Sequence, residues 1–104
     1  MNTKKKSVAR RYFKQLRKGP LTFGKMLESI RMADELTQTE VAKRIDVSRA
    51  HLCDIEKGRC PVTVERATQL AKALGYSVNQ FVAVTLEDQL RNAGLKVKVK
   101  LEAA

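Results

Sequence analysis

Two short amphipathic segments, residues 38–45 and 49–57, lie only three residues apart and constrain the fold more than any other feature of this chain. Thr37-Gln-Thr-Glu40 is a capping-box pattern, in which a hydroxyl and a carboxylate pair with free amide groups of a helix's first turn. Ser48 can cap a second helix, which Gly58 can end. Two helices joined by so short a turn predict a helix-turn-helix.

The same kinds of signal predict three further helices around this pair. Residues 22–33 carry apolar side chains at helical spacing, and a helix from Thr63 to Leu74 is followed by Gly75. Ser77-Val-Asn-Gln80 is a second capping-box pattern and begins a helix that runs to about residue 92. The predicted fold class is therefore all-α, with five helices in a bundle. The residues predicted to face inward from the first three of these helices, 22–33, 38–45 and 49–57, are Phe23, Met26, Leu27, Ile30, Val41, Ala42, Ile45, Leu52 and Ile55.

Basic residues are concentrated at the start of the chain. The first 20 residues hold eight of the 21 basic side chains and none of the 11 acidic ones, so the other 84 carry 13 basic and 11 acidic. Apolar residues between Val8 and Leu16 fall on one side at helical spacing, so residues 1–19 are predicted to form a basic amphipathic arm. An arm of this charge is attracted to polyanions.

Three interpretations of the arm stay open: contact with a DNA backbone, binding of a partner protein, and contact with a membrane surface. We favour packing of its apolar stripe on the protein's own core or dimer mate, combined with long-range attraction to DNA. The membrane interpretation is weaker because the stripe is short and lacks tryptophan.

The C-terminal residues change the hydrophobic period from that of a helix to that of a strand. Apolar and lysine side chains alternate over residues 95–101, and no second strand is predicted anywhere in the chain. A single strand is not stable alone, so we expect it to pair with the same strand of a second subunit. The alternative is a frayed, lysine-rich tail. The predicted dimer strand consists of Leu95, Val97, Val99 and Leu101. The predicted domains are thus the arm (1–19), a helix-turn-helix domain (20–84) and a dimerising helix end and strand (85–104).

The only histidine and both cysteines lie close together at His51, Cys53 and Cys60, but their spacing does not suit a metal site. Residues two apart on a helix point about 200° apart, so His51 and Cys53 do not share an ion. We therefore predict no metal and no cofactor. A Cys53–Cys60 disulfide stays open, as does a thiol sensor at Cys53, against the simpler interpretation of small, reduced residues.

No pattern in this sequence supports an enzyme. One histidine, no glycine-rich phosphate loop and no spaced carboxylates leave nothing to anchor a mechanism. The sequence also lacks an apolar run of 18 residues and a signal-peptide h-region, so we expect no membrane association and a cytoplasmic location.

The helix predicted over residues 49–57 has one face free to meet a partner. At about 100° per residue, Leu52 and Ile55 lie on the buried arc and His51 lies on the flank. The presented arc consists of Arg49, Ala50, Cys53, Asp54 and Lys57. It carries no large apolar group, as a helix entering a DNA major groove requires. The alternative is an ordinary amphipathic helix with a solvated face.

The segment "LTQTEVAKRIDVSRAHLCDIEKGR", residues 36–59, resembles the helix-turn-helix of the Xre family, which includes the lambdoid phage repressors and Cro. "LAKALGYS", residues 70–77, is similar to the family's next helix and its glycine stop. The resemblance covers about residues 22–81 and implies a lambda-repressor-like bundle that binds double-stranded DNA. It further implies a transcriptional repressor that acts as a homodimer on a palindromic operator.

The resemblance also implies roles for particular residues. The base-reading positions fall on Arg49, Ala50 and Asp54. The positions that lie near DNA phosphates are Gln38, Ser48, His51, Lys57 and Arg59. Arg31 and Glu56 match an ion pair that ties the first helix to the recognition helix in some relatives.

Two departures from the family pattern affect these expectations. Asp46 stands where the turn usually has glycine, although aspartate tolerates left-handed geometry better than most residues. Ala50 offers no hydrogen bond to a base, and Asp54 could accept only from a cytosine amino group while repelling phosphate. Arg49 is therefore the residue we expect to read sequence, most simply at a guanine.

Residues 59–81 are also similar to antitoxins of the host-inhibition-of-growth type, which belong to the same family. In those antitoxins a Thr-capped helix with a spacing of Ala and Leu residues follows the loop. The matching residues here are Thr63, Ala67, Leu70 and Ala71. That resemblance implies an alternative function, in which the protein neutralises a toxin partner and represses its own operon. Phe81 replaces the tryptophan usual at that position.

Overall fold

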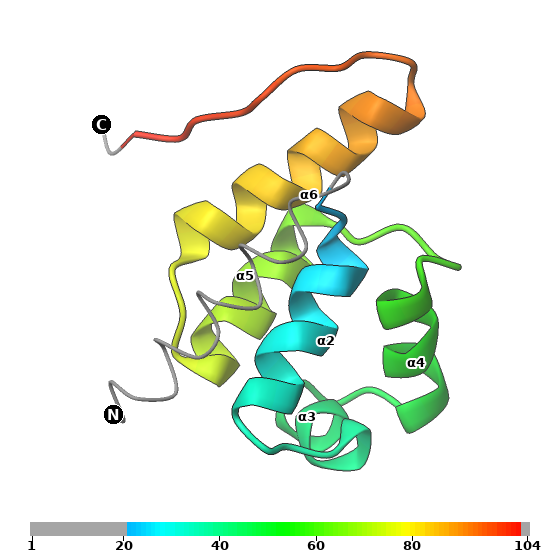
Figure 1. Ribbon diagram of the computed structural model, residues 1–104. Coiled ribbons are helices and arrows are strands. Elements are labelled where there is room, and N and C mark those ends of the chain that lie inside the picture. The colour runs from blue at the N-terminus through cyan, green and yellow to red at the C-terminus, as the bar shows by residue number, and fades with distance from the viewer. Residues whose placement is uncertain (1–20, 103–104) are drawn as a thin grey trace.

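The computed structural model describes residues 21–102, which form five helices and no strand. The predicted arm, residues 1–19, lies outside the described residues. Figure 1 shows α2, α3 and α4 on one side of the molecule and the longest helix, α6, crossing over α5. The helices are α2 (Phe23–Ala33), α3 (Gln38–Arg44), α4 (Arg49–Lys57), α5 (Val64–Leu74) and α6 (Val78–Asn92). The all-α prediction of five helices is confirmed.

Each described helix begins at a hydroxyl side chain that accepts a hydrogen bond from the backbone three residues later. At α3 the predicted capping box is complete, because Thr37 accepts from the Glu40 amide and the Glu40 side chain accepts from the Thr37 amide. The other N-caps are Thr22, Ser48, Thr63 and Ser77. These local bonds satisfy amide groups that a helix start would otherwise leave unpaired.

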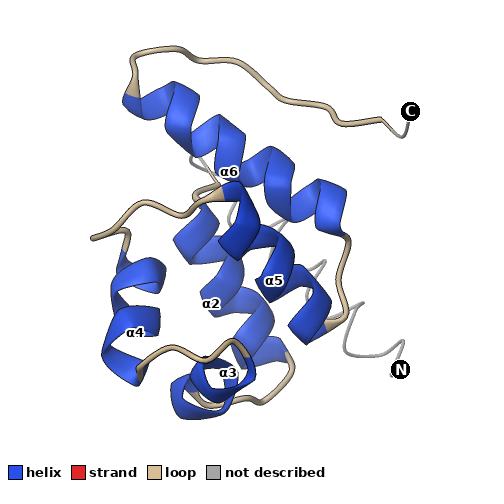
Figure 2. Ribbon diagram, turned by 180° about the vertical axis from the view of Figure 1, so that it is seen from behind, coloured by secondary structure: helices blue, strands red, loops and turns tan. Residues whose placement is uncertain are grey.

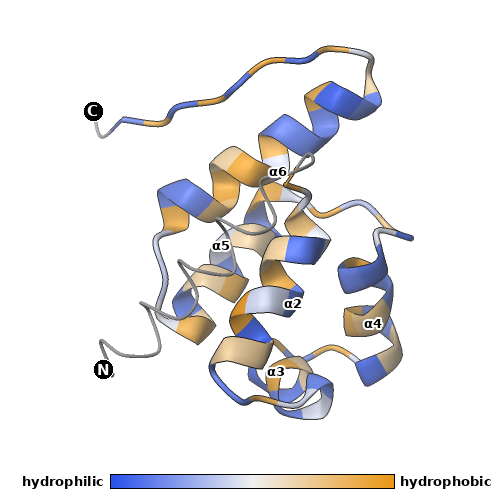
Figure 3. Cartoon of the chain, in the orientation of Figure 1, coloured by the Kyte–Doolittle hydropathy of each residue, from blue (hydrophilic) through white to orange (hydrophobic). Residues whose placement is uncertain are grey.

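The core lies where the five helices meet, and it is aliphatic with two phenylalanines. The rings of Phe23 and Phe81 meet edge to face with centroids 5.8 Å apart, which joins α2 to α6. Figure 3 shows hydrophobic residues along each of the five described helices. The residues predicted to face inward are buried: Phe23, Met26, Leu27, Ile30, Val41, Ala42, Ile45, Leu52 and Ile55.

A polar contact between distant parts of the sequence fixes the start of α2 against α6. The Phe23 amide donates to a carboxylate oxygen of Asp88 at 2.8 Å, and Arg91 pairs with the other carboxylate oxygen at 2.9 Å. A carboxylate near a helix N-terminus is favourable because the helix dipole is positive there. The helix α6 is continuous across the predicted domain boundary at residues 84/85, and Thr85 is buried.

The turns that follow the helices use left-handed backbone at five described positions. Asp46 has φ 55°, so the aspartate adopts the geometry expected of the glycine usual in this turn. Glu35, in the α2–α3 turn, has φ 57°, which the sequence did not indicate. The helix-ending glycines Gly58, Gly75 and Gly94 also have positive φ.

The structure does not support the predicted C-terminal strand, because the single chain shows no strand there. Residues 95–101 are extended but carry no strand ladder, and the chain leaves α6 and turns back beside it without pairing (Figures 1 and 2). A strand is stabilised by hydrogen bonds to a neighbouring strand, and the described chain supplies none. Of the dimer-strand residues, Val99 donates its amide to Glu87 at 2.9 Å, and the side chains of Leu95, Val97 and Leu101 are exposed. The alternation therefore produces an extended tail.

Among residues 21–102, no helix is both long enough and apolar enough to cross a membrane.

Candidate nucleic-acid interface

The core holds α4 by its inner face. Leu52 and Ile55 are fully buried, and Val47 in the preceding turn packs against the core. At its C-terminal end α4 meets the backbone of α2, because the hydrogen of Gly24 faces the carbonyl groups of Ile55 and Glu56 with no room for a side chain. The helix is thus fixed both by apolar contact and by a close approach of two backbones.

The outer face of α4 is turned to solvent, as the helical spacing predicts. Arg49, Ala50 and Lys57 are exposed, while Cys53 and Asp54 are half-buried. The guanidinium group of Arg49 forms no hydrogen bond or ion pair within residues 21–102. This face therefore presents one free, fork-shaped hydrogen-bond donor at the first turn of the helix, beside a small side chain.

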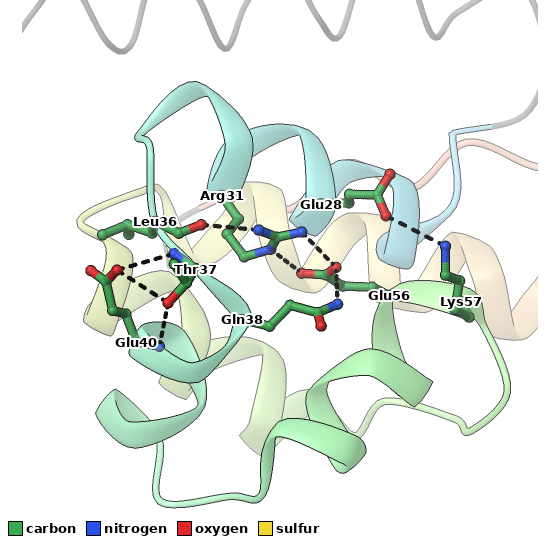
Figure 4. Close-up of polar contacts among 8 residues, drawn as sticks. All are labelled: Glu28, Arg31, Leu36, Thr37, Gln38, Glu40, Glu56 and Lys57. Carbon is green, nitrogen blue, oxygen red and sulfur yellow. Dashed lines mark hydrogen bonds and ion pairs between the residues drawn. The ribbon is translucent and has the colours of Figure 1, made fainter.

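Behind this face lies a buried polar cluster that joins α2, α3 and α4 (Figure 4). The Glu56 side chain is 0% exposed, and its two oxygens accept from Arg31 Nε at 2.7 Å and Arg31 Nη2 at 3.2 Å. Arg31 also donates to the Leu36 carbonyl oxygen at 2.9 Å, at the turn before α3. Gln38, the first residue of α3, donates its side-chain amide to Glu56 Oε1 at 3.0 Å. Arg31 and Glu56 thus form an ion pair, and Gln38 belongs to the same cluster.

Two of the basic residues predicted to bind phosphate are engaged with carboxylates of their own chain. Arg59 Nη1 lies 3.2 Å from Asp54 Oδ1, and Lys57 Nζ lies 4.0 Å from Glu28 Oε2. All four side chains are substantially exposed, so each pair contributes little to stability. The Arg59 pair also partly neutralises the one acidic group on the outer face of α4, which reduces its repulsion of phosphate.

Ser48 and His51 lie at the exposed start of α4. The Ser48 hydroxyl oxygen accepts the His51 amide at 3.0 Å as the N-cap of the helix, which leaves its own O–H free to donate. The His51 ring is exposed on the flank. The five residues predicted to meet phosphate therefore lie at the start of α3, at both ends of α4 and just beyond its C-terminus.

The opposite end of α3 is held by side chains that the sequence did not single out. Arg66 and Gln69, both on α5, donate to the Ile45 carbonyl oxygen at 3.3 and 3.1 Å. Ile45 is the C-cap of α3, where the last carbonyl groups have no partner within the helix. These bonds fix the end of α3 before the turn into α4, and only the folded chain brings α5 to this place.

The cysteines are free thiols in this structure. Burial raises the pKa of Cys60, and the negative charge of Asp54 raises that pKa further. A raised pKa disfavours the thiolate, which is both the nucleophile and the metal ligand. Within the described part of the chain, no three His, Cys, Asp or Glu side chains cluster in a way that could hold a metal ion.

Taken together, two helices joined by a tight turn, the second buried on one side and polar on the other, define a helix-turn-helix DNA-binding domain. The comparison with known families agrees, since the helix-turn-helix family matches residues 27–81 of this chain. The match spans more than half of the chain, which therefore belongs to that family.

The immunity repressor protein of Bacillus phage phi105 is similar to this chain over 62 residues, with 34% identity. Those residues are 60% of this chain and 43% of the phage protein, so the chain spans less than half of that relative's length. No solved structure matches the chain.

Proposed function

We propose that this protein is a sequence-specific transcriptional repressor that binds an operator in double-stranded DNA as a homodimer. The observation that carries the proposal is the exposed outer face of α4, a helix fixed to the core. On this face Arg49, which has no partner among residues 21–102, lies beside Ala50. A helix with small and polar outer residues fits a major groove. The similarity to a phage immunity repressor supports the repressor role.

In this proposal three residues of α4 read the bases. Arg49 donates two hydrogen bonds to the O6 and N7 acceptors of a guanine, a contact worth about 1–3 kcal/mol of discrimination. Ala50 touches a thymine methyl group. Asp54 accepts from a cytosine amino group, and its ion pair with Arg59 lowers the cost of bringing a carboxylate near the DNA backbone.

The surrounding polar residues position the protein on the backbone. Ser48, His51 and Gln38 offer hydrogen-bond donors, while Lys57 and Arg59 supply positive charge. On binding, Lys57 exchanges its carboxylate partner Glu28 for phosphate, whereas Arg59 keeps its pair with Asp54 and offers its other guanidinium nitrogens to phosphate. Phosphate contacts fix the register of the protein but carry no sequence information. The basic arm, residues 1–19, adds attraction to DNA at longer range.

A single α4 reads only a few base pairs, so we propose a homodimer on a palindromic site. Two-fold related recognition helices require half-sites about one helical turn, 10–10.5 base pairs, apart. Selection of bound duplexes from a random pool, followed by footprinting, tests this directly. The expected result is a palindrome with that spacing. Recovery of unrelated sequences at equal affinity would contradict sequence-specific binding.

Base reading is tested by Arg49→Ala, with Lys57→Ala as the matched control at the other end of α4. Arg49→Ala should weaken binding to the selected site far more than binding to random duplex. Lys57→Ala should weaken both about equally and lower the salt slope by about 0.9. An equal loss on both duplexes for Arg49→Ala would show that Arg49 only holds phosphate.

The antitoxin alternative stays a prediction from the resemblance of residues 59–81. It requires a toxin that co-purifies with this chain. Affinity purification from the native host, followed by mass spectrometry, distinguishes the two roles. A stoichiometric small partner whose toxicity is relieved by this chain would establish the antitoxin, and it would leave operator binding intact.

A further inference from the structure

We propose that Glu56 is a positioning residue for DNA binding, because it fixes the side-chain amide of Gln38 so that one N–H can reach a backbone phosphate. The inference rests on the proposed function, in which Gln38 contacts phosphate. It adds that the contact depends on a residue that never touches DNA.

The geometry begins with the burial of Glu56. Its side chain is 0% exposed, and it accepts three hydrogen bonds, two from Arg31 and one from Gln38. Arg31 is itself only 14% exposed and is also bonded to the Leu36 carbonyl oxygen. The carboxylate therefore cannot turn away from Gln38 without losing contacts to a buried guanidinium group, which would be costly.

The carboxylate also decides which way the Gln38 amide faces. A glutamine amide carries two donors on its nitrogen and two lone pairs on its oxygen. An oxygen of a carboxylate accepts only from the nitrogen, so Nε2 faces Glu56 and Oε1 faces the opposite side, as Figure 4 shows. One N–H of Gln38 is used by Glu56, and the second remains available.

The second N–H is the group that a phosphate requires, since a phosphate oxygen can only accept. Gln38 is half-buried, so its amide lies at the boundary between the buried cluster and solvent. Without the carboxylate the amide could rotate by half a turn and present its oxygen to DNA, which would repel the phosphate. Glu56 belongs to α4, and it thus connects this helix with the contact that Gln38 on α3 makes to the DNA phosphate backbone.

The experiment measures binding of the full chain to a fluorescent mixed-sequence duplex of about two helical turns, a probe that reports phosphate contacts without a known operator. The variants are Gln38→Ala, Glu56→Gln and the double variant. Asp88→Asn is the matched control, because it removes the same charge from a carboxylate on α6 whose hydrogen bonds are to Phe23 and Arg91 and not to Gln38 or α4. Affinity is measured at a temperature where circular dichroism shows each variant folded.

We expect Gln38→Ala and Glu56→Gln each to weaken binding about threefold to tenfold. The double variant should bind no more weakly than Gln38→Ala. Neither change should alter the salt slope, because a neutral amide releases no counterion. Asp88→Asn should lower stability and leave affinity unweakened. Wild-type affinity for Glu56→Gln, or additive losses in the double variant, would overturn the proposal.

Nuclear magnetic resonance of the wild-type chain gives a readout that needs no variant to fold. The Nε2 proton of Gln38 that is hydrogen-bonded to Glu56 should lie downfield of the ordinary shift of a glutamine side-chain amide in the free protein. Saturation with the duplex should change the chemical shift of the other Nε2 proton of Gln38. If both protons keep their free shifts while the chain is fully bound, the inference is wrong. A wild-type chain that binds no duplex would instead reject the proposed function itself.

Discussion

Replacement of Gly24 by alanine tests how closely α2 and α4 approach. A Cβ at this position would lie 2.7 Å from the Ile55 carbonyl oxygen and 2.9 Å from the Glu56 carbonyl carbon, with the Glu56 carbonyl oxygen nearer still. All three are backbone atoms of α4, so no side-chain rotation relieves the overlap. Carbon–oxygen contacts normally lie at about 3.3–3.6 Å, so α4 would have to move by at least about half an ångström.

Two effects of opposite sign set the expected magnitude. Alanine favours a helix interior over glycine by about 1 kcal/mol. Overpacking typically costs about 1–3 kcal/mol, and a clash with backbone belongs at the upper end of that range. We therefore expect Gly24→Ala to lower the free energy of unfolding by about 2 kcal/mol and the melting temperature by about 8–16 °C.

Thermal and urea unfolding followed by circular dichroism measure this change. Lys25→Ala is the control for helix propensity, since Lys25 is the next residue of α2 and is exposed. Gly58→Ala is the control for left-handed backbone, because Gly58 has φ 74° and open space around it. A Gly24→Ala protein as stable as the wild type, or more stable, would show that α2 and α4 are not in such close contact.

Three further results follow from the structure. The pKa of Tyr76 is raised to about 12 by burial, by the charge of Asp34 and by their hydrogen bond, so stability is retained below the tyrosine's ordinary pKa and declines as pH rises toward 12. In an ultraviolet titration, Tyr76→Phe should abolish the tyrosine ionisation that occurs near pH 12. An ionisation near pH 12 that survives in this variant contradicts the assignment. Cys60 should react slowly with a thiol reagent near pH 8, and Asp54→Asn should speed this reaction because it removes a charge that raises the pKa of Cys60. An unchanged reaction rate would show that the Asp54 charge does not act on the Cys60 thiol. Deletion of residues 1–18 should weaken binding to all duplexes and flatten the salt dependence, and an unchanged slope would remove the arm from the interface.

Much of this fold was predictable because its signals are local. Thr37 and Glu40 cap α3 from within one turn, and Ser77 caps α6 in the same way. The burial of Leu52 and Ile55 in α4 follows from the helical period alone. A cap or an apolar stripe depends on residues three or four apart, which a sequence displays directly.

Contacts between distant residues were not predictable in the same way. The bond from the Phe23 amide to Asp88 spans 65 positions, and the bond from Gln38 to Glu56 spans 18. The strand predicted for residues 95–101 is not seen for a related reason. Alternation of apolar and polar residues indicates a strand but does not supply the neighbouring strand that it needs. For the candidate site, the sequence indicated which residues face outward, whereas only the structure shows that Lys57 and Arg59 already hold carboxylates.

The division of labour within α4 bears on how such a protein can acquire new targets. Leu52, Ile55 and Glu56 hold the helix in place, while Ala50 is exposed on its outer face. A substitution at Ala50 therefore costs little folding free energy, and the same holds for an exchange of Arg49. A lineage with this architecture can explore different operators by single exchanges at those positions, without first acquiring compensating changes in its core.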